Sequence, residues 1–82
     1  MSSFVQVYSI TAGGSFKMPY NGFIAVASAH SNVTVGITID GTIFNFEGHV
    51  SNGIIKYYDM PIPQGTIVNI SHADAKVMAF SK

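Results

Sequence analysis

The chain has 82 residues, a length that fits one small domain, residues 1–82. Four basic and four acidic residues give a formal net charge of zero, and charged residues make up 10% of a chain that is 48% hydrophobic and has no cysteine. This composition excludes a disordered protein, a nucleic-acid binder that relies on clustered basic residues, a disulfide framework and a thiolate metal site.

The first third of the chain predicts short strands separated by turns. Residues 4–10 are rich in β-forming residue types, and the glycine pair at 13–14 separates them from a short run at 15–18. Residues 19–22, Pro-Tyr-Asn-Gly, predict a turn whose Asn-Gly pair tolerates positive φ. Residues 23–29 form an apolar run with little alternation, which is typical of a central strand covered on both faces.

The middle of the chain predicts a β-hairpin. From Val33 to Ile39 apolar residues alternate with Thr and Gly, the pattern of a strand with one buried face. Asp40-Gly41 follows, and then a second β-rich run at 42–46. Asp-Gly between two such runs indicates a type I′ turn, because both central residues of that turn need positive φ.

The last third predicts further strands at 54–60, 66–71 and 76–81. Two prolines within residues 61–65 keep that segment out of the centre of a sheet. Residues 71–74, Ser-His-Ala-Asp, resemble a helix capping box, so a short helix after them is an alternative. A strand is favoured there because the run is too short for a stable helix.

The fold class follows from this count. About eight short strands at regular spacing, with no repeat and no linker, predict an all-β protein. We expect a single antiparallel β-sandwich, or a jelly roll, spanning residues 1–82.

The side chains that carry catalysis or bind metals are sparse. The three histidines, His30, His49 and His72, lie in predicted turns, and only His72 has a possible metal-ligating neighbour close in sequence, Asp74. No pair of carboxylates suits general acid–base chemistry, and no nucleophile elbow or phosphate-binding loop is present. We therefore expect no enzyme activity, no cofactor and no metal site.

A few exposed residues are candidates for contacts with other molecules. Tyr20, Asn21, His30 and Asn32 lie in predicted turns and could bind a ligand or a partner. Tyr57 and Tyr58 are neighbours on a predicted strand and therefore face opposite sides, so one belongs to the core and the other is free for an interface. For a subunit interface we expect Phe4, Tyr8 and one of Tyr57 and Tyr58.

Association with other chains is expected from size and charge. For a domain this small, burial of apolar surface stabilises the fold by about as much as conformational entropy destabilises it, so an interface adds stability where it is needed. Zero net charge also favours association over dispersal. No apolar run reaches the length of a membrane span and no signal peptide is recognisable, so we expect synthesis in the cytoplasm and no membrane partner.

Three segments together resemble a known family. Residues 16–26 are similar to the aromatic-x-x-Pro-x-x-Gly-aromatic segment that leads into a central strand in small jelly-roll domains of tailed-phage fibres and decoration proteins. Residues 39–42 look like their central hairpin, and residues 60–70 resemble a proline- and glycine-containing segment near their end. More distantly, the segments resemble tumour-necrosis-factor-like and complement-collagen-like heads. The resemblance implies a trimer with a structural or adhesive role and without catalysis.

These observations lead to one expected function and two alternatives. We expect a non-enzymatic phage virion protein, located in the virion, that decorates or cements the capsid as a trimer. Its partners would be its own copies and other virion proteins, such as the major capsid protein, whose contact requires a shape-complementary surface. The first alternative is a receptor- or carbohydrate-binding module of a tail fibre or baseplate, and the second is a stand-alone lectin.

Overall fold

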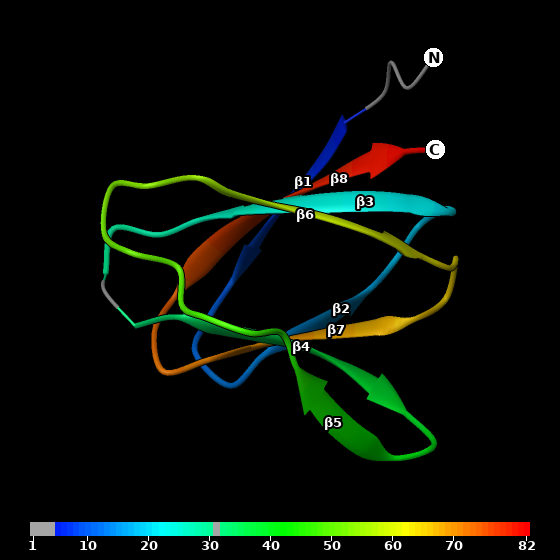
Figure 1. Cartoon of the computed structure of the whole chain (residues 1–82), viewed down its shortest axis with the longest axis horizontal. Helices are drawn as coiled ribbons and strands as arrows, with labels where there is room; N and C mark the ends of the chain where they lie inside the picture. Colours follow the sequence, from blue (N-terminus) through cyan, green and yellow to red (C-terminus); the bar gives the residue numbers. More distant parts are fainter. Residues whose placement is uncertain (1–4, 31) are drawn as a thin grey trace.

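The computed structural model describes residues 5–30 and 32–82, which contain strands and no helix (Figure 1). All eight predicted strands lie within two residues of their predicted bounds at both ends. The strands are β1 (Val5–Ile10), β2 (Ser15–Lys17), β3 (Gly22–Ala27), β4 (Thr34–Ile39), β5 (Thr42–Asn45), β6 (Lys56–Ile62), β7 (Ile67–Ser71) and β8 (Ala75–Ser81).

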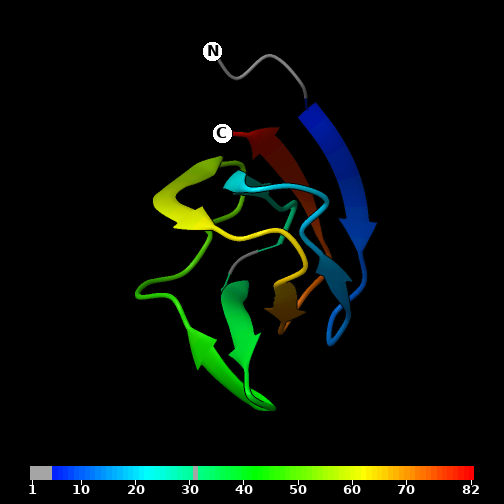
Figure 2. The same ribbon diagram turned by 90° about the vertical axis from the view of Figure 1, so that its right-hand side faces the viewer.

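The strands form two antiparallel sheets of four, in the orders β1-β8-β3-β6 and β2-β7-β4-β5. Each of the first four strands pairs with its counterpart counted from the end: β1 with β8, β2 with β7, β3 with β6 and β4 with β5. The chain is thus one long hairpin wound into two layers, which is the jelly-roll topology. The prediction of an eight-stranded β-sandwich or jelly roll is confirmed. Figure 2 shows β1 beside β8 at the edge of the first sheet.

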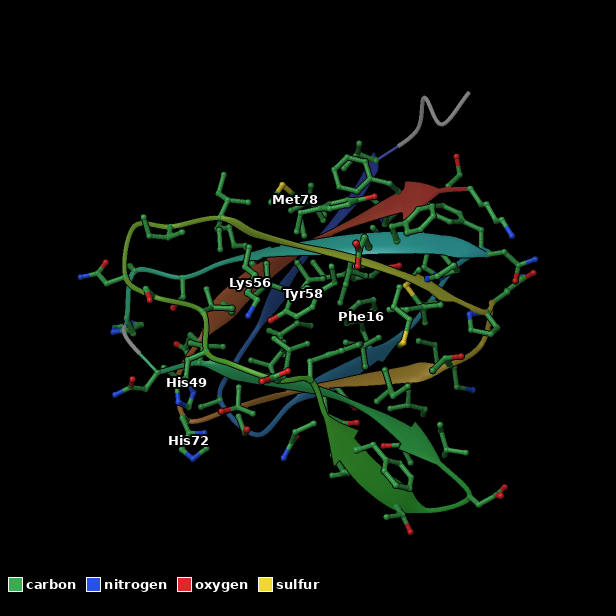
Figure 3. The ribbon with its side chains drawn as sticks, in the orientation of Figure 1. Phe16, His49, Lys56, Tyr58, His72 and Met78 are labelled. Carbon is green, nitrogen blue, oxygen red and sulfur yellow. The ribbon has the colours of Figure 1, made fainter. Side chains whose placement is uncertain are left out.

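The core lies between the two layers, as Figure 3 shows for Phe16 and Tyr58. Alternate residues of each inner strand point into it, because successive side chains of a strand face opposite sides. Full burial of one such aliphatic side chain contributes about 1.5–3 kcal/mol. The core residues with no exposed surface are Ile24, Val26, Val33, Val50, Val68, Val77 and Ala79.

The β4–β5 connection is the predicted two-residue turn. Asp40 has φ of 51° and Gly41 has φ of 78°, as a type I′ turn requires. The two strands extend beyond the sandwich in Figure 1, and all four residues of β5 are exposed. The hairpin is therefore correctly predicted, but its outer strand contributes little to the core.

One predicted turn differs from expectation. Neither Asn21 nor Gly22 has positive φ; instead Gly22 begins β3 and pairs with Ser81 of β8. Pro61 lies inside β6, which the sheet tolerates because β6 is an edge strand and its free side needs no N–H donor. The strand predicted at 54–60 therefore lies two residues further along the chain. Residues 75–81 form a strand, as favoured, and not the alternative helix.

One buried polar atom in the core lacks a partner. The hydroxyl group of Tyr58 is buried and makes no hydrogen bond with the residues that the structure describes. An unsatisfied buried hydroxyl destabilises a fold by about 1–3 kcal/mol. We therefore predict that Tyr58→Phe raises the free energy of unfolding by about 1 kcal/mol in urea denaturation. A fall in the free energy of unfolding would instead show that the hydroxyl group makes a stabilising hydrogen bond.

The same residue gives a prediction for alkaline pH. Burial raises the pKa of Tyr58 above its ordinary value of 10.0. Above pH 10 the unfolded chain loses this proton before the folded chain does, so the free energy of unfolding falls as the pH rises. Phenylalanine has no proton to lose, so the advantage of Tyr58→Phe over the wild type should grow above pH 10. A constant difference across this range would contradict the assignment.

Candidate functional site

The sheet β1-β8-β3-β6 carries an apolar surface on the side that faces away from the other sheet. Its strands bury Ile24, Val26, Val77 and Ala79 inward, so the residues that alternate with them point outward. Figure 3 shows Met78 projecting away from the second sheet. We call this surface the aromatic face, and it consists of Val5, Val7, Phe23, Ala25, Tyr57, Met78 and Phe80.

Register and ring contacts hold the aromatic face together. Val7, Met78, Ala25 and Tyr57 pair in one row across all four strands. The Tyr57 ring lies 6.2 Å from the ring of Phe23 and 6.3 Å from the ring of Phe80, within the range of favourable aromatic pairs. None of these side chains is charged, and Tyr57 is 56% and Val7 55% exposed. The aromatic face is thus a continuous apolar surface that reaches solvent.

The cause lies in the sequence of β3 and β8. Both strands are apolar at consecutive positions, so each presents apolar side chains on both faces. A two-layer sandwich covers only one face of each sheet with its own second sheet. The prediction that residues 23–29 form a central strand is correct, but the second sheet covers only one of its two faces.

Further apolar side chains are exposed on the other sheet. Ile39, Ile43 and Phe44, on the β4–β5 hairpin, are each at least 50% exposed. The hairpin extends from the sheet opposite the aromatic face (Figure 1). Ile39 and Phe44 lie on one face of the hairpin and Ile43 lies on the other, so the hairpin exposes apolar side chains on both faces.

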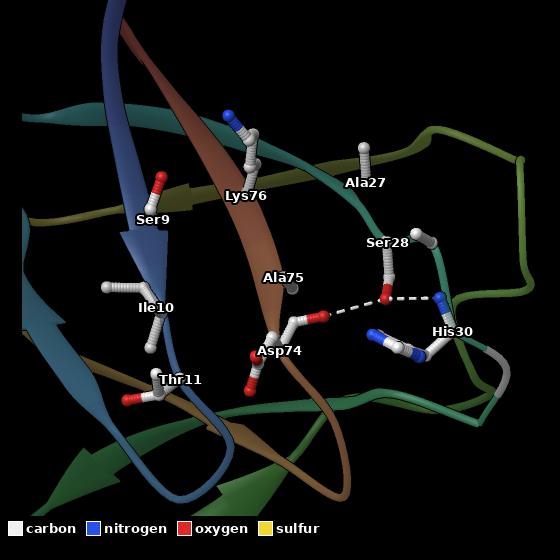
Figure 4. Close-up of a pocket in the computed structure, with 10 residues that line it drawn as sticks. Ser9, Ile10, Thr11, Ala27, Ser28, His30, Asp74, Ala75 and Lys76 are labelled. Carbon is white, nitrogen blue, oxygen red and sulfur yellow. Dashed lines mark hydrogen bonds between the residues drawn. The ribbon is translucent and has the colours of Figure 1, made fainter.

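A hollow of about 320 Å³ lies at one end of the aromatic face. It spans the end of β1, the end of β3 and the start of β8, which lies between them (Figure 4). Ser9, Lys76 and Ala27 pair in the row next to Met78 and link the hollow to the aromatic face. The lining residues are Ser9, Ile10, Thr11, Ala27, Ser28, Ala29, His30, Asp74, Ala75 and Lys76.

Hydrogen bonds between three turns shape the hollow. The Ser28 hydroxyl donates to the carbonyl of Asp74 at 2.7 Å and accepts from the backbone N–H of His30 at 3.0 Å (Figure 4). The Asp74 carboxylate accepts from the backbone N–H of Ala12 at 2.9 Å. These bonds fix the β1–β2, β3–β4 and β7–β8 turns relative to one another.

The four predicted ligand residues lie at two ends of the molecule. Tyr20 and Asn21 precede β3, whereas His30 and Asn32 follow it. Asn21 accepts the backbone N–H of Gln64 at 2.8 Å and thereby joins two turns. His30 lines the hollow, and Asn32 is an exposed turn residue with φ of 66°. The structure does not bring the four together into one site.

Tyr20 is half-buried and its hydroxyl donates to the carbonyl of Ala79, a core residue of β8, at 2.5 Å. A net contribution of about 1 kcal/mol is usual for such a bond. We predict that Tyr20→Phe lowers the free energy of unfolding by about 1 kcal/mol in urea denaturation. An unchanged midpoint would show that the hydroxyl group has no structural role.

The predicted interface residues also separate. Tyr57 belongs to the aromatic face, whereas Tyr58 is 7% exposed and packs against Phe46, so Tyr58 is not available to an interface. Tyr8 is half-buried, with its ring stacked on Phe16 at 4.4 Å, and it points inward. Phe4 lies outside the described residues. Of the predicted set, the structure therefore places Tyr57 alone on an exposed apolar surface.

The other members of the aromatic face were not singled out from the sequence. The available signal was the lack of alternation in residues 23–29 and in residues 77–80, where apolar side chains occupy both faces. In a two-layer sandwich, that pattern indicates a face that the second sheet does not cover.

The described residues form neither a metal site nor a membrane-spanning helix. Among residues 5–30 and 32–82, no three His, Cys, Asp or Glu side chains are grouped to hold a metal ion. Within the same part of the chain, no helix has the length and apolar character needed to cross a membrane. No protein-family profile matches the chain, and the comparisons found neither a curated protein nor a solved structure similar to it.

Proposed function

We propose that the protein is a non-enzymatic structural subunit that associates with its own copies through the aromatic face. The observation that carries the proposal is the second apolar side of β3 and β8, which the other sheet does not cover and on which Phe23, Met78 and Phe80 are partly exposed. Exposed apolar surfaces of this kind mark contacts with other molecules, and aromatic side chains are enriched at such interfaces.

A second copy of the chain is the occupant that fits this surface best. The seven side chains of the aromatic face are uncharged, and Lys76 lies in the next row toward the hollow, so copies can bring the apolar side chains together without placing like charges among them. The chain also has a net charge of zero, which removes long-range repulsion between copies. Closed cyclic assembly buries the face without leaving a surface for further growth.

The number of subunits and the setting come from the family resemblance. Small jelly-roll domains of phage decoration and fibre proteins, which the chain resembles in residues 16–26, 39–42 and 60–70, imply a trimer in the virion. We propose a trimer that decorates or cements a phage capsid. The exposed Ile39, Ile43 and Phe44 of the β4–β5 hairpin would then contact other virion proteins such as the major capsid protein, because they lie on the opposite sheet.

The setting is tested by locating the protein in intact particles. Gold-labelled antibody against the chain is applied to purified particles and viewed by electron microscopy. Label on the capsid is the expected result. Label on the tail fibre or baseplate would favour the receptor-binding alternative, and particles without the protein would contradict a role in the virion.

A further inference from the structure

We propose that the hollow at the ends of β1 and β3 binds a neutral sugar ring, most simply one terminal monosaccharide of a glycan. This binding site goes beyond the proposed function, which uses the aromatic face and the β4–β5 hairpin. The hollow is built from three turns, and its chemistry selects the ligand class.

The hollow has the size and rigidity of a small binding site. Its volume of about 320 Å³ is at the lower end of the range for ligand pockets, which suits a single ring. Hydrogen bonds hold its three turns together. The Ser28 hydroxyl bonds to the His30 N–H and the Asp74 carbonyl, and the Asp74 carboxylate bonds to the Ala12 N–H. A site held in this way needs little ordering when a ligand binds.

Polar groups at the rim are available to a ligand. Within the described residues, the hydroxyls of Ser9 and Thr11, the His30 ring and the Lys76 ammonium make no hydrogen bond, and one Asp74 carboxylate oxygen is also free. Figure 4 shows the His30 ring directed toward Asp74. The rim therefore offers both donors and acceptors.

The charges of the rim argue against other ligand classes. An anion would meet the Asp74 carboxylate, and a cation would meet the Lys76 ammonium. A fully apolar ligand would remove these groups from water without replacing their hydrogen bonds, which is costly. A sugar hydroxyl both donates and accepts, so a neutral polyhydroxylated ring can pair with groups of either sign.

The walls of the hollow suit the apolar side of such a ring. Ile10, Ala27, Ala29 and Ala75 contribute aliphatic surface between the polar groups. The C–H groups of a sugar, or the methyl group of an acetamido substituent, can pack against these short side chains. Because none of the described residues that line the hollow is Phe, Tyr or Trp, we expect weak binding, with a dissociation constant on the order of 1 mM for a monosaccharide.

The test is a titration of the isotope-labelled chain followed by nuclear magnetic resonance. The probes are glucose, galactose, N-acetylglucosamine and N-acetylgalactosamine, with acetate and ethylammonium as charged comparisons. We expect at least one of the four sugars to shift the backbone amide signals of Thr11, His30 and Ala75. No saturable shift with any of the four, or binding of only the charged probes, would overturn the proposal.

Matched variants tie the binding to the hollow. Asp74→Asn keeps an acceptor for the Ala12 N–H but removes the charge, and His30→Ala removes an exposed ring that makes no hydrogen bond with the described residues. We expect each to weaken sugar binding at least tenfold without lowering the melting temperature by more than a few degrees. The same changes at exposed positions elsewhere, Asp59→Asn and His49→Ala, should leave binding unchanged. If the control variants weakened sugar binding as much as the variants in the hollow, the assignment of the site would be wrong.

Discussion

Replacement of Tyr57 with lysine is expected to convert the assembled protein into folded monomers. Tyr57 is 56% exposed, lies on the edge strand β6 and contacts Phe23 and Phe80 of the aromatic face. An aromatic anchor of an interface contributes at least about 2 kcal/mol, so the loss corresponds to a rise of at least about 30-fold in the dissociation constant. A lysine there would also place like charges together in the assembly. Sedimentation velocity at matched concentrations measures the effect.

Phe44→Lys provides the matched control. Phe44 is an aromatic residue of nearly the same exposure, 54%, but it lies on β5 in the other sheet. This variant should keep the wild-type oligomeric state. Dissociation by Phe44→Lys but not by Tyr57→Lys would move the self-association surface to the hairpin and contradict the assignment to the aromatic face.

Gly22→Ala is expected to prevent folding. A Cβ atom on Gly22 would lie 1.8 Å from the carbonyl oxygen of Phe80 and 2.9 Å from its carbonyl carbon. Both are backbone atoms of β8, so no side-chain rotation relieves the clash, and β3 would have to separate from β8. We expect a loss of more than about 4 kcal/mol, comparable to the whole stability of a domain of this size. Circular dichroism and a one-dimensional proton spectrum would show the unfolded chain.

Gly65→Ala separates this steric effect from ordinary glycine replacement. Gly65 has φ of 86°, and no atom lies within 4 Å of a Cβ built there. Gly65→Ala should lower the free energy of unfolding only by the strain of a left-handed backbone, about 1–2 kcal/mol, and the protein should stay folded. If Gly22→Ala were as stable as Gly65→Ala, the close approach of β3 and β8 would be wrong.

The local structure could be predicted where a residue pair is compatible with only one backbone conformation. Asp40-Gly41 predicted the hairpin because few other pairs adopt two positive φ values in succession. Gly22 was expected to serve a turn in the same way, yet its role is the close approach to Phe80, which depends on a strand nearly sixty residues away. Pro61 is excluded from the centre of a sheet, which agrees with its place in the edge strand β6, although only the sheet order shows that β6 is an edge.

The candidate surfaces were harder to predict for a related reason. Apolar residues at consecutive positions of β3 and β8 indicate two apolar faces, but the pattern does not say which of the two is covered. The hollow combines residues near positions 10, 28 and 75, and the jelly-roll winding alone brings them together. The turn position of His30 makes it a candidate ligand-binding residue from the sequence alone. Only the fold shows that Asp74 and Lys76 line the same hollow.

Sedimentation of the wild-type protein over a wide dilution range tests self-association most directly. The account predicts an assembly at micromolar concentration, and the family resemblance sets its size at three times the 8.8 kDa mass of the chain. The assembly should dissociate on dilution into a less stable monomer, since the interface contributes to stability. A dimer would contradict only the number of subunits. A stable, folded 8.8 kDa monomer at micromolar concentration would contradict the proposal that the aromatic face binds further copies of the chain.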